Sequence, residues 1–330
     1  GPAGLCAGKT NRGRDRLLQL FGGNDMSASA HRFCAVDGIE AGDPLAGTAT
    51  HAESNLLISW PRPKWSRSLR IARDMDDDLA SRVNRLAASG RRVNLIHQRG
   101  RPALRHRLYL LPEGRSFDVE RRDLPAFLEA LESGNDLSGW AGTAMTASLV
   151  LCCTHGRKDK CCAKFGYATY QELARTVADR DLPFEVWESS HLGGCRLAAS
   201  IMVFPSMRKY GRVAPEQVLP FLQHEADGLP YLPCYRGQSL LTPAQQCAEI
   251  SALEWLSDRN IRAALSVGPE ASCDDSKEVA VQVDWASNDD SGALTARCGT
   301  MEVVRVDTCA DLDEGPTASL CWVVKNIRPL

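Results

Sequence analysis

Residues 148–165, SLVLCCTHGRKDKCCAKF, decide the fold of this chain. The apolar run 148–153 has the length and composition of a buried strand. Residues 162–180 carry apolar residues at helical spacing, and residues 184–187 form a second apolar run. A strand, a helix and a strand in this order predict a parallel βαβ crossover.

The surrounding sequence predicts the same order of elements twice, β-α-β-β-β-α. The first set comprises strands at 55–60, 93–96, 107–111 and 115–119, with helices at 76–88 and 123–131. The second comprises strands at 148–153, 184–187, 198–204 and 209–213, with helices at 162–180 and 215–226. Leu111-Pro112 stands beside Phe204-Pro205 at an offset of 93 residues. We therefore expect an internal duplication of one α/β unit, and its order of elements is that of a thioredoxin-like unit.

Four parts are expected along the chain. Residues 1–25 are interpreted as a tag or disordered leader, with Met26 as a native start. Residues 26–145 form the first unit and residues 146–230 the second. Residues 231–330 form a connector and a β-rich appendage, with a helix at 244–256 and strands at 279–285, 302–306 and 319–326. The predicted fold class is α/β, with two tandem thioredoxin-like units and this appendage.

Composition excludes several classes of protein. The chain has 330 residues, of which 44% are hydrophobic and 24% charged, with a net charge of -2. Binding to nucleic acid by bulk charge is disfavoured. The longest apolar runs are far shorter than the roughly 18 residues that a membrane span needs. Neither nucleic acid nor a membrane is expected as a partner.

The chain contains thirteen cysteines. We find no apolar signal-peptide core in the first 25 residues, which predicts a reducing, cytoplasmic location. In that setting clustered cysteines indicate metal or redox chemistry.

Four residues are candidate ligands: Cys153, Cys162, His191 and Cys195. They follow the first strand, begin the helix and follow the second strand of the βαβ unit, so they converge at the carboxyl edge of the sheet. Strand alternation lets only one of Cys152 and Cys153 face this site. A helix N-terminus and nearby lysines favour the thiolate form of Cys162.

The spacing favours a two-iron cluster. Eight residues between Cys153 and Cys162 are too many for a zinc knuckle. Three thiolates and one imidazole can hold a 2Fe-2S cluster, with two cysteines on one iron and Cys with His on the other. A single zinc ion and thiol redox chemistry stay as alternatives. A one-residue slip to Cys152 or Cys161 and a fifth ligand at His155 are also open.

The motif 153–162 with HLGGCR at 191–196 resembles the sucrase/ferredoxin-like family, whose C-terminal part is similar to thioredoxin-like ferredoxins. GDPLAGTA at 42–49 and WPRPKW at 60–65 add to the resemblance. It implies a ferredoxin-type unit with a 2Fe-2S cluster bound through C-x8-C and H-x3-H. This chain has Cys195 in place of the second histidine, which gives a Cys3His set. We find no paired glycosidase carboxylates and do not expect sugar cleavage.

The expected function is electron transfer rather than catalysis, coupled to a proton through His191. An iron-sulfur sensor or cluster-transfer protein is an alternative, and so is a thiol-disulfide oxidoreductase or zinc-binding protein. The basic loop 157–164 could dock an acidic redox partner protein, and a homodimer is possible.

Several other residues receive structural interpretations. His97 is the repeat counterpart of His191, but Trp60 replaces the first cysteine, so the first unit is expected to lack a cluster. Trp187 and Tyr210 are expected in the core, and Arg196 is expected to hold Asp159. Seven further cysteines are interpreted as small core or surface residues. They are Cys34, Cys234, Cys247, Cys273, Cys298, Cys309 and Cys321.

Overall fold

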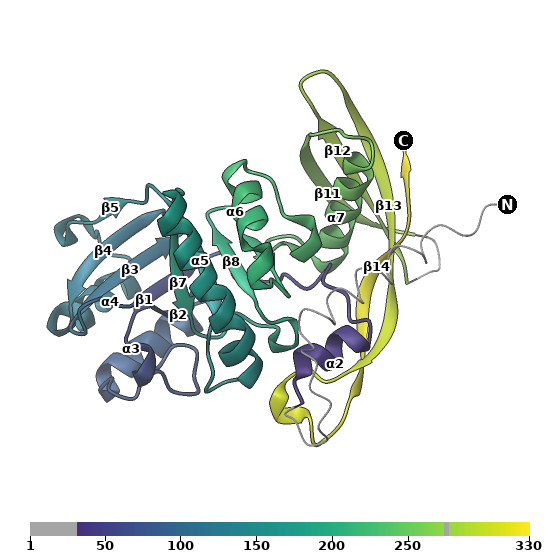
Figure 1. Ribbon diagram of the computed structural model, residues 1–330. Coiled ribbons are helices and arrows are strands. Elements are labelled where there is room, and N and C mark those ends of the chain that lie inside the picture. The colour runs from purple at the N-terminus through teal and green to yellow at the C-terminus, as the bar shows by residue number, and fades with distance from the viewer. Residues whose placement is uncertain (1–31, 274–276) are drawn as a thin grey trace.

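Two units with the same order of elements share one ten-stranded sheet in the computed structural model (Figure 1). The structure describes residues 32–273 and 277–330. The expected leader, residues 1–25, and Met26 lie outside the described residues.

The elements follow the duplicated order. The first unit contains β1 (Asn55–Ser59), α3 (Asp77–Ala88), β2 (Arg92–His97), β3 (Arg105–Leu111), β4 (Arg115–Glu120), α4 (Leu124–Glu132) and the short β5 (Thr143–Ala144). The second contains β6 (Ser148–Cys153), α5 (Tyr167–Arg180), β7 (Phe184–Ser189), β8 (Ile201–Phe204), β9 (Arg208–Tyr210) and α6 (Val218–Ala226). A short helix, α2 (Cys34–Glu40), precedes the first unit.

The two units also have equivalent strand topology. The sheet order is β10-β9-β8-β6-β7-β2-β1-β3-β4-β5. Strands β1 and β2 are parallel, as are β6 and β7, while the hairpins β3-β4 and β8-β9 are antiparallel. The units meet where β2 pairs antiparallel with β7, with Ile96 opposite Ser189 and His97 opposite Glu188. The predicted α/β class with two thioredoxin-like units is confirmed.

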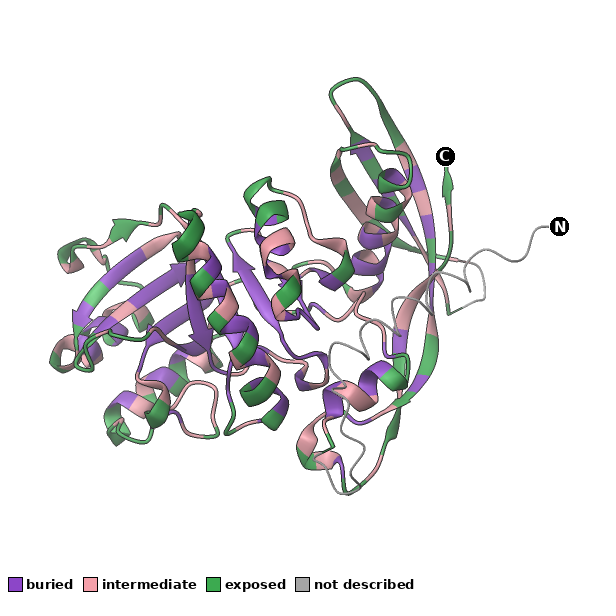
Figure 2. Ribbon diagram, in the orientation of Figure 1, coloured by how far each residue is buried: buried purple, intermediate pink, exposed green. Residues whose placement is uncertain are grey.

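Helix α3 shows why these segments form as they do. The Asp76 carboxylate accepts a hydrogen bond of 2.8 Å from the backbone N–H of Leu79 and caps the first turn. Leu79, Val83 and Leu86 recur at helical spacing and are buried. The charged face of the helix stays exposed, whereas the central strands are buried (Figure 2).

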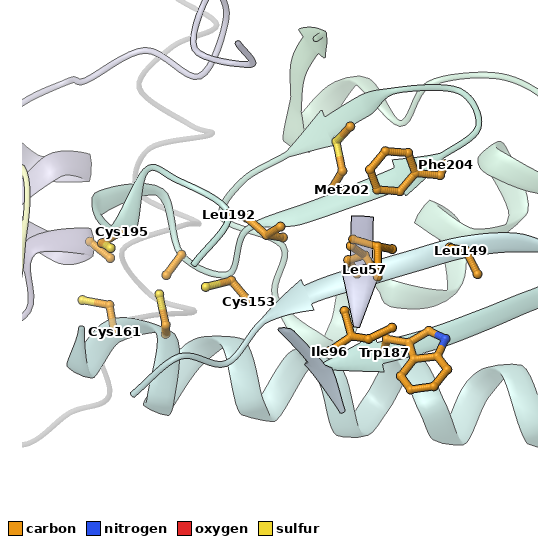
Figure 3. Packing of buried hydrophobic residues seen from close by; sticks show 14 of the residues in the cluster. Leu57, Ile96, Leu149, Cys153, Cys161, Trp187, Leu192, Cys195, Met202 and Phe204 are labelled. Carbon is orange, nitrogen blue, oxygen red and sulfur yellow. The ribbon is translucent and has the colours of Figure 1, made fainter. Parts of the chain in front are cut away.

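One hydrophobic core crosses the joint between the units. It includes Leu57 and Ile96 from the first unit with Leu149 and Trp187 from the second (Figure 3). The Tyr109 and Trp187 rings pack edge to face with centroids 5.8 Å apart. Trp187 and Tyr210 are fully buried, as their core interpretation predicted.

Two predicted strands of the second unit are shorter than expected. The strand at 198–204 begins only at Ile201, because Cys195–Leu197 forms a 3-10 turn. The strand at 209–213 ends at Tyr210. Arg212 adopts a φ of +56°, which an extended strand does not allow.

The C-terminal region is an antiparallel sheet of four strands covered by one helix. Its elements are α7 (Pro243–Ser257), β11 (Ala264–Ser272), β12 (Val279–Ala286), β13 (Ser291–Arg305) and β14 (Thr317–Pro329). The predicted lengths of the two long strands, β13 and β14, are too short. Strand β11, and β10 (Tyr235–Gln238) in the connector, were not predicted. Exposure explains why β11 was missed, because this strand is largely exposed and lacks a strong apolar alternation. None of the helices in the described ranges is long and apolar enough to cross a membrane.

Candidate metal centre

The structure brings the four predicted ligands into contact at the carboxyl edge of the second βαβ unit. Cys153 ends β6, Cys162 begins the turn that leads into α5, and His191 and Cys195 lie between β7 and β8. The Cys195 Sγ lies 3.5 Å from His191 Nδ1. Cys153 is hydrogen-bonded to both Cys162 and His191, and Cys162 also contacts Cys195. Figure 3 shows the sulfurs of Cys153 and Cys195 pointing toward the same space.

A glycine allows the helix to start beside the end of the strand. Cys162–Gly166 forms a wide π-helical turn before α5. A Cβ atom on Gly166 would lie 2.0 Å from the carbonyl oxygen of Cys153, so any side chain would push the two elements apart. Gly193 and Gly194, with φ of 90° and 78°, turn the chain between His191 and Cys195.

Hydrogen bonds among the four side chains shift their pKa values in opposite directions. The hydrogen bond from Cys162 holds the pKa of Cys153 well below its usual range and also lowers the pKa of Cys195. The same contacts raise the pKa of Cys162. Burial lowers the pKa of His191, but hydrogen bonds to Cys153 and Cys195 outweigh burial and raise it to about 9. These shifts favour the thiolate form of Cys153 and Cys195, the form of cysteine that binds metals. The expectation that the helix start favours the thiolate of Cys162 is wrong for the four side chains by themselves, because the hydrogen bonds to Cys153 and Cys195 and burial raise the pKa of Cys162.

Three basic side chains hold the loop that carries His191 and Cys195. Arg92 donates to the carbonyl of His191 at 2.7 Å, and Lys209 donates to that of Leu192 at 2.8 Å. Arg236 donates to the carbonyl of Gly193 at 3.3 Å and to Thr48. These bonds fix three consecutive carbonyls, and the two arginines place positive charge behind the ligand loop. Burial lowers the pKa of Lys209 well below its usual range.

His155 is not available as a fifth ligand. Its Nδ1 accepts a hydrogen bond of 3.2 Å from the backbone N–H of His191, and its Nε2 lies 2.8 Å from the carbonyl oxygen of Ser66. Both ring nitrogens are thus engaged, and the side chain is buried. His155 supports the His191 loop instead.

The two neighbouring cysteines point away from the site. The Cys152 thiol donates to the carbonyl of Gly166 at 3.3 Å and packs in the core on the other face of the sheet. The Cys161 Sγ lies 3.6 Å from Cys34 Sγ and 3.2 Å from Cys309 Sγ. Neither thiol faces His191, as strand and helix geometry require of adjacent residues.

The expected pair of Arg196 and Asp159 is wrong. Arg196 binds the buried carboxylate of Asp43 at 2.8 Å and reaches Asp307 at 3.4 Å. Asp159 accepts backbone hydrogen bonds from Cys161 at 2.8 Å and from Cys309 at 2.7 Å. Proximity along the motif misled the prediction, because Arg196 faces the N-terminal segment.

A second group of thiols escaped the sequence analysis. Cys34 and Cys309, interpreted as isolated core or surface residues, meet Cys161 and Asp159 at a separate point. The signal that could have found this group is the pair Cys161-Cys162. Adjacent helical residues point in different directions, so a second thiol there indicates a second environment.

The first unit has no equivalent site among its described residues. Trp60 occupies the place of Cys153, and its ring stacks on His106 with centroids 4.3 Å apart. Its Nε1 donates to Asp74 at 2.8 Å. His97 lies in β2 opposite Glu188. An aromatic cluster thus fills the position that thiols occupy in the second unit.

Comparison with known families is decisive for the assignment of the chain. The sequence pattern of the sucrase/ferredoxin-like family matches residues 45–237, more than half of the chain. The chain belongs to this family. The family match spans both units and ends within β10, before the C-terminal sheet.

Curated relatives match over short regions. Two proteins named altered inheritance of mitochondria protein 32 are similar, one from Clavispora lusitaniae and one from Debaryomyces hansenii. The first is 32% identical over 30% of this chain and 37% of its own length. The second is 35% identical over 21% of this chain and 28% of its own length. The matched region is therefore about a third of each relative.

Solved structures of the thioredoxin-like [2Fe-2S] ferredoxin from Aquifex aeolicus also match. One is 17% identical, covers 27% of this chain and 89% of its own, and has a TM-score of 0.25. A second structure of the same ferredoxin is 16% identical with a TM-score of 0.24, covering 27% of this chain and 95% of its own.

Proposed function

We propose that this protein is a 2Fe-2S electron carrier whose cluster is held by Cys153, Cys162, His191 and Cys195. The observation that carries the proposal is the convergence of three thiols and one imidazole from two loops of one βαβ unit. Three thiolates and an imidazole are a known kind of donor set for iron-sulfur clusters.

The four proposed cluster ligands form a group separate from the other thiols of the site region. Neighbouring side chains in the ring of four contact one another in pairs. Within the described residues, the group whose donor atoms all lie within 4.8 Å of one another is a different one, Cys34, Asp159, Cys161 and Cys309. The cluster is therefore assigned to the ring that includes His191, because a 2Fe-2S cluster with imidazole and thiolate ligands has a precedent.

A bound 2Fe-2S cluster would supply reversible one-electron transfer. The chain's own residues then set the stability of the bound cluster and its reduction potential. Burial of Cys153 and Cys162 keeps water from the sulfurs, which stabilises the bound group against loss. The cationic side chains of Arg92 and Arg236 behind the loop oppose the negative charge of three thiolates. Both the charge count and these cations favour a potential above that of all-cysteine ferredoxins, about -400 mV.

His191 couples the electron to a proton in this proposal. Its Nδ1 faces Cys195, so Nδ1 would be the ligand and Nε2 would carry the proton. The residue is half-buried, which leaves the ring accessible to solvent protons. Addition of an electron raises the negative charge at the site and so raises the pKa of Nε2.

The partner would be a redox protein with an acidic face. Arg157, Lys160 and Lys164 are exposed on the loop and helix start that carry Cys162. This positive surface belongs to the same segment as Cys162 and would steer an acidic partner toward it.

The compartment in this proposal is the reducing cytoplasm, where thiols stay available as metal ligands. Cell fractionation tests this placement. Recovery in mitochondria, the organelle in the name of the two relatives, would contradict a cytoplasmic location.

The decisive experiment is spectroscopic. We expect protein purified without oxygen to absorb between roughly 320 and 600 nm, to bleach with dithionite and to contain two irons and two sulfides per chain. Cys162→Ser should abolish the spectrum, whereas Cys152→Ser, its matched control, should retain it. A colourless protein without iron would overturn the proposal.

A pH titration of the midpoint potential tests the role of His191. We expect the potential to fall as pH rises, by about 59 mV per pH unit where one proton accompanies one electron. A potential independent of pH between about 6 and 9 would remove the proton coupling while leaving the electron carrier intact.

A further inference from the structure

Three thiols and a carboxylate meet at a second point, separate from the proposed cluster. The Cys34 Sγ lies 3.6 Å from Cys161 Sγ and 3.5 Å from Cys309 Sγ. Cys161 and Cys309 are 3.2 Å apart, and Asp159 Oδ2 lies 3.9 Å from Cys34 Sγ. The four donor atoms all lie within 4.8 Å of one another. Segments 275 residues apart in the chain supply them.

Backbone N–H groups point at these donor atoms. The N–H of Cys34 donates to Cys309 Sγ at 3.5 Å, and the N–H of Ala35 donates to Cys161 Sγ. Asp159 accepts from the N–H of Cys161 at 2.8 Å through Oδ1 and from that of Cys309 at 2.7 Å through Oδ2. Backbone donors of this kind stabilise thiolates and hold metal ligands in place. Each carboxylate oxygen keeps a lone pair for a further bond.

The distances fit one tetrahedral ion. With Zn–S bonds of about 2.3 Å, two sulfurs on a tetrahedral zinc lie about 3.8 Å apart. The observed separations of 3.2, 3.5 and 3.6 Å are close to this edge length. A covalent disulfide would need about 2.05 Å instead.

We propose that Cys34, Asp159, Cys161 and Cys309 bind one zinc ion. Thiolate-rich tetrahedral sites select zinc among common divalent ions, and Asp oxygen is an accepted fourth ligand. Binding displaces a proton from each of the three thiols. The Asp159 carboxylate binds the ion without losing a proton. Four protein ligands close the coordination sphere, so the site is structural.

Zinc here would fasten three parts of the chain together. Cys34 begins α2, Cys161 lies directly before the proposed cluster ligand Cys162, and Cys309 lies in the link between β13 and β14. Figure 1 shows α2 beside the end of the β13-β14 ribbon. Cys34 and Cys195 belong to the same buried cluster of side chains. The ion would thus hold the N-terminal helix and the C-terminal sheet against the proposed cluster site.

Metal analysis of the full chain tests the proposal. We expect about one zinc per chain in addition to the iron, measured by mass spectrometry of the metals after purification without chelators. Cys309→Ser should lose the zinc and keep the iron and its visible spectrum. Cys162→Ser should lose the iron and keep the zinc. Cys273→Ser, a half-buried cysteine of the C-terminal sheet, is the matched control and should keep both metals.

A second measurement does not depend on the stability of one variant. Co²⁺ added to the iron-free Cys162→Ser protein should give the intense visible bands of a tetrahedral thiolate site. Asp159→Asn in the same background should weaken Co²⁺ binding by about tenfold or more.

Three outcomes would overturn the zinc site. The first is wild-type protein that holds no zinc and binds neither Zn²⁺ nor Co²⁺. The second is a Cys161–Cys309 disulfide in protein alkylated without oxygen. The third is a folded Cys309→Ser protein that loses iron, which would assign these thiols to the cluster. Absence of iron with zinc present would overturn the electron carrier alone.

Discussion

Cys195 is the residue that sets this chain apart from a pattern with two histidines. Its Sγ lies beside His191 Nδ1, so a change here alters the charge of the site directly. In the proposed cluster, an imidazole in place of this thiolate makes the site one unit less negative and makes reduction easier.

We predict that Cys195→His raises the midpoint potential by on the order of 100 to 300 mV, because a neutral ligand replaces an anionic one. Protein-film voltammetry measures the shift. Cys195→Ala, which offers no ligand, should lose iron instead. An unchanged potential in Cys195→His would show that Cys195 is not a ligand.

His51 predicts a dependence of stability on pH. Its Nε2 lies 2.9 Å from Asn55 Oδ1, and its Nδ1 is buried without a hydrogen-bond partner. Burial, together with the charges of Lys209 and Arg92, lowers its pKa from 6.5 to about 2. Between these values the unfolded chain binds a proton that the folded chain does not. The free energy of unfolding should therefore fall as pH drops below 6.5, by at most about 1.4 kcal/mol per pH unit.

Denaturant titrations at a series of pH values measure this slope. His51→Gln removes the titrating group and should flatten the slope between about pH 6.5 and 5. His224→Gln, at an exposed histidine, should leave it unchanged. Equal slopes in wild type and His51→Gln would contradict the assignment.

At the scale of elements, the contact between β6 and the start of α5 positions the site. Gly166 lies against the carbonyl of Cys153 with no room for a Cβ atom. Since Cys153 and Cys162 sit on either side of this contact, the width of the gap sets the distance between two proposed ligands.

We predict that Gly166→Ala destabilises the fold by on the order of 1 to 3 kcal/mol and lowers the iron content, because the helix start must move away from β6. Thermal unfolding and an iron assay measure the two effects. Gly139→Ala, where a Cβ atom would meet nothing within 4 Å, is the matched control. Full iron content in a stable Gly166→Ala protein would show that the site tolerates a wider gap.

At the scale of the molecule, the two units behave as one folded body. Only two residue pairs join β2 to β7, so the ladder alone is a weak link. The shared core around Trp187 adds apolar contacts from both units, and the Asn94 side chain donates to Ser190 Oγ at 3.0 Å across the joint.

We predict that Trp187→Ala costs about 3 to 5 kcal/mol, as removal of a fully buried tryptophan does. Because the core is shared, far-UV circular dichroism and cluster absorption should be lost at the same denaturant concentration. Trp255 is a half-buried tryptophan of α7 whose ring stacks on Arg259. Trp255→Ala should lower the free energy of unfolding by less than Trp187→Ala does. Two separate transitions would show that the units unfold independently.

The sequence by itself determined the local elements and the residues of the proposed cluster site. Apolar periodicity placed the strands and helices of both units, because hydrogen bonding and side-chain direction repeat with the period of each element. The βαβ connection then required Cys153, Cys162 and His191 to meet at one edge. Their role as ligands stays a prediction.

Only the tertiary structure decided which distant segments touch. It paired β2 with β7, placed Arg196 on Asp43, and brought Cys34 and Cys309 to Cys161. These contacts depend on how whole surfaces pack, and spacing along the chain carries no information about a contact 275 residues away. A single cysteine in the sequence is therefore indistinguishable from a core residue until its neighbours are known.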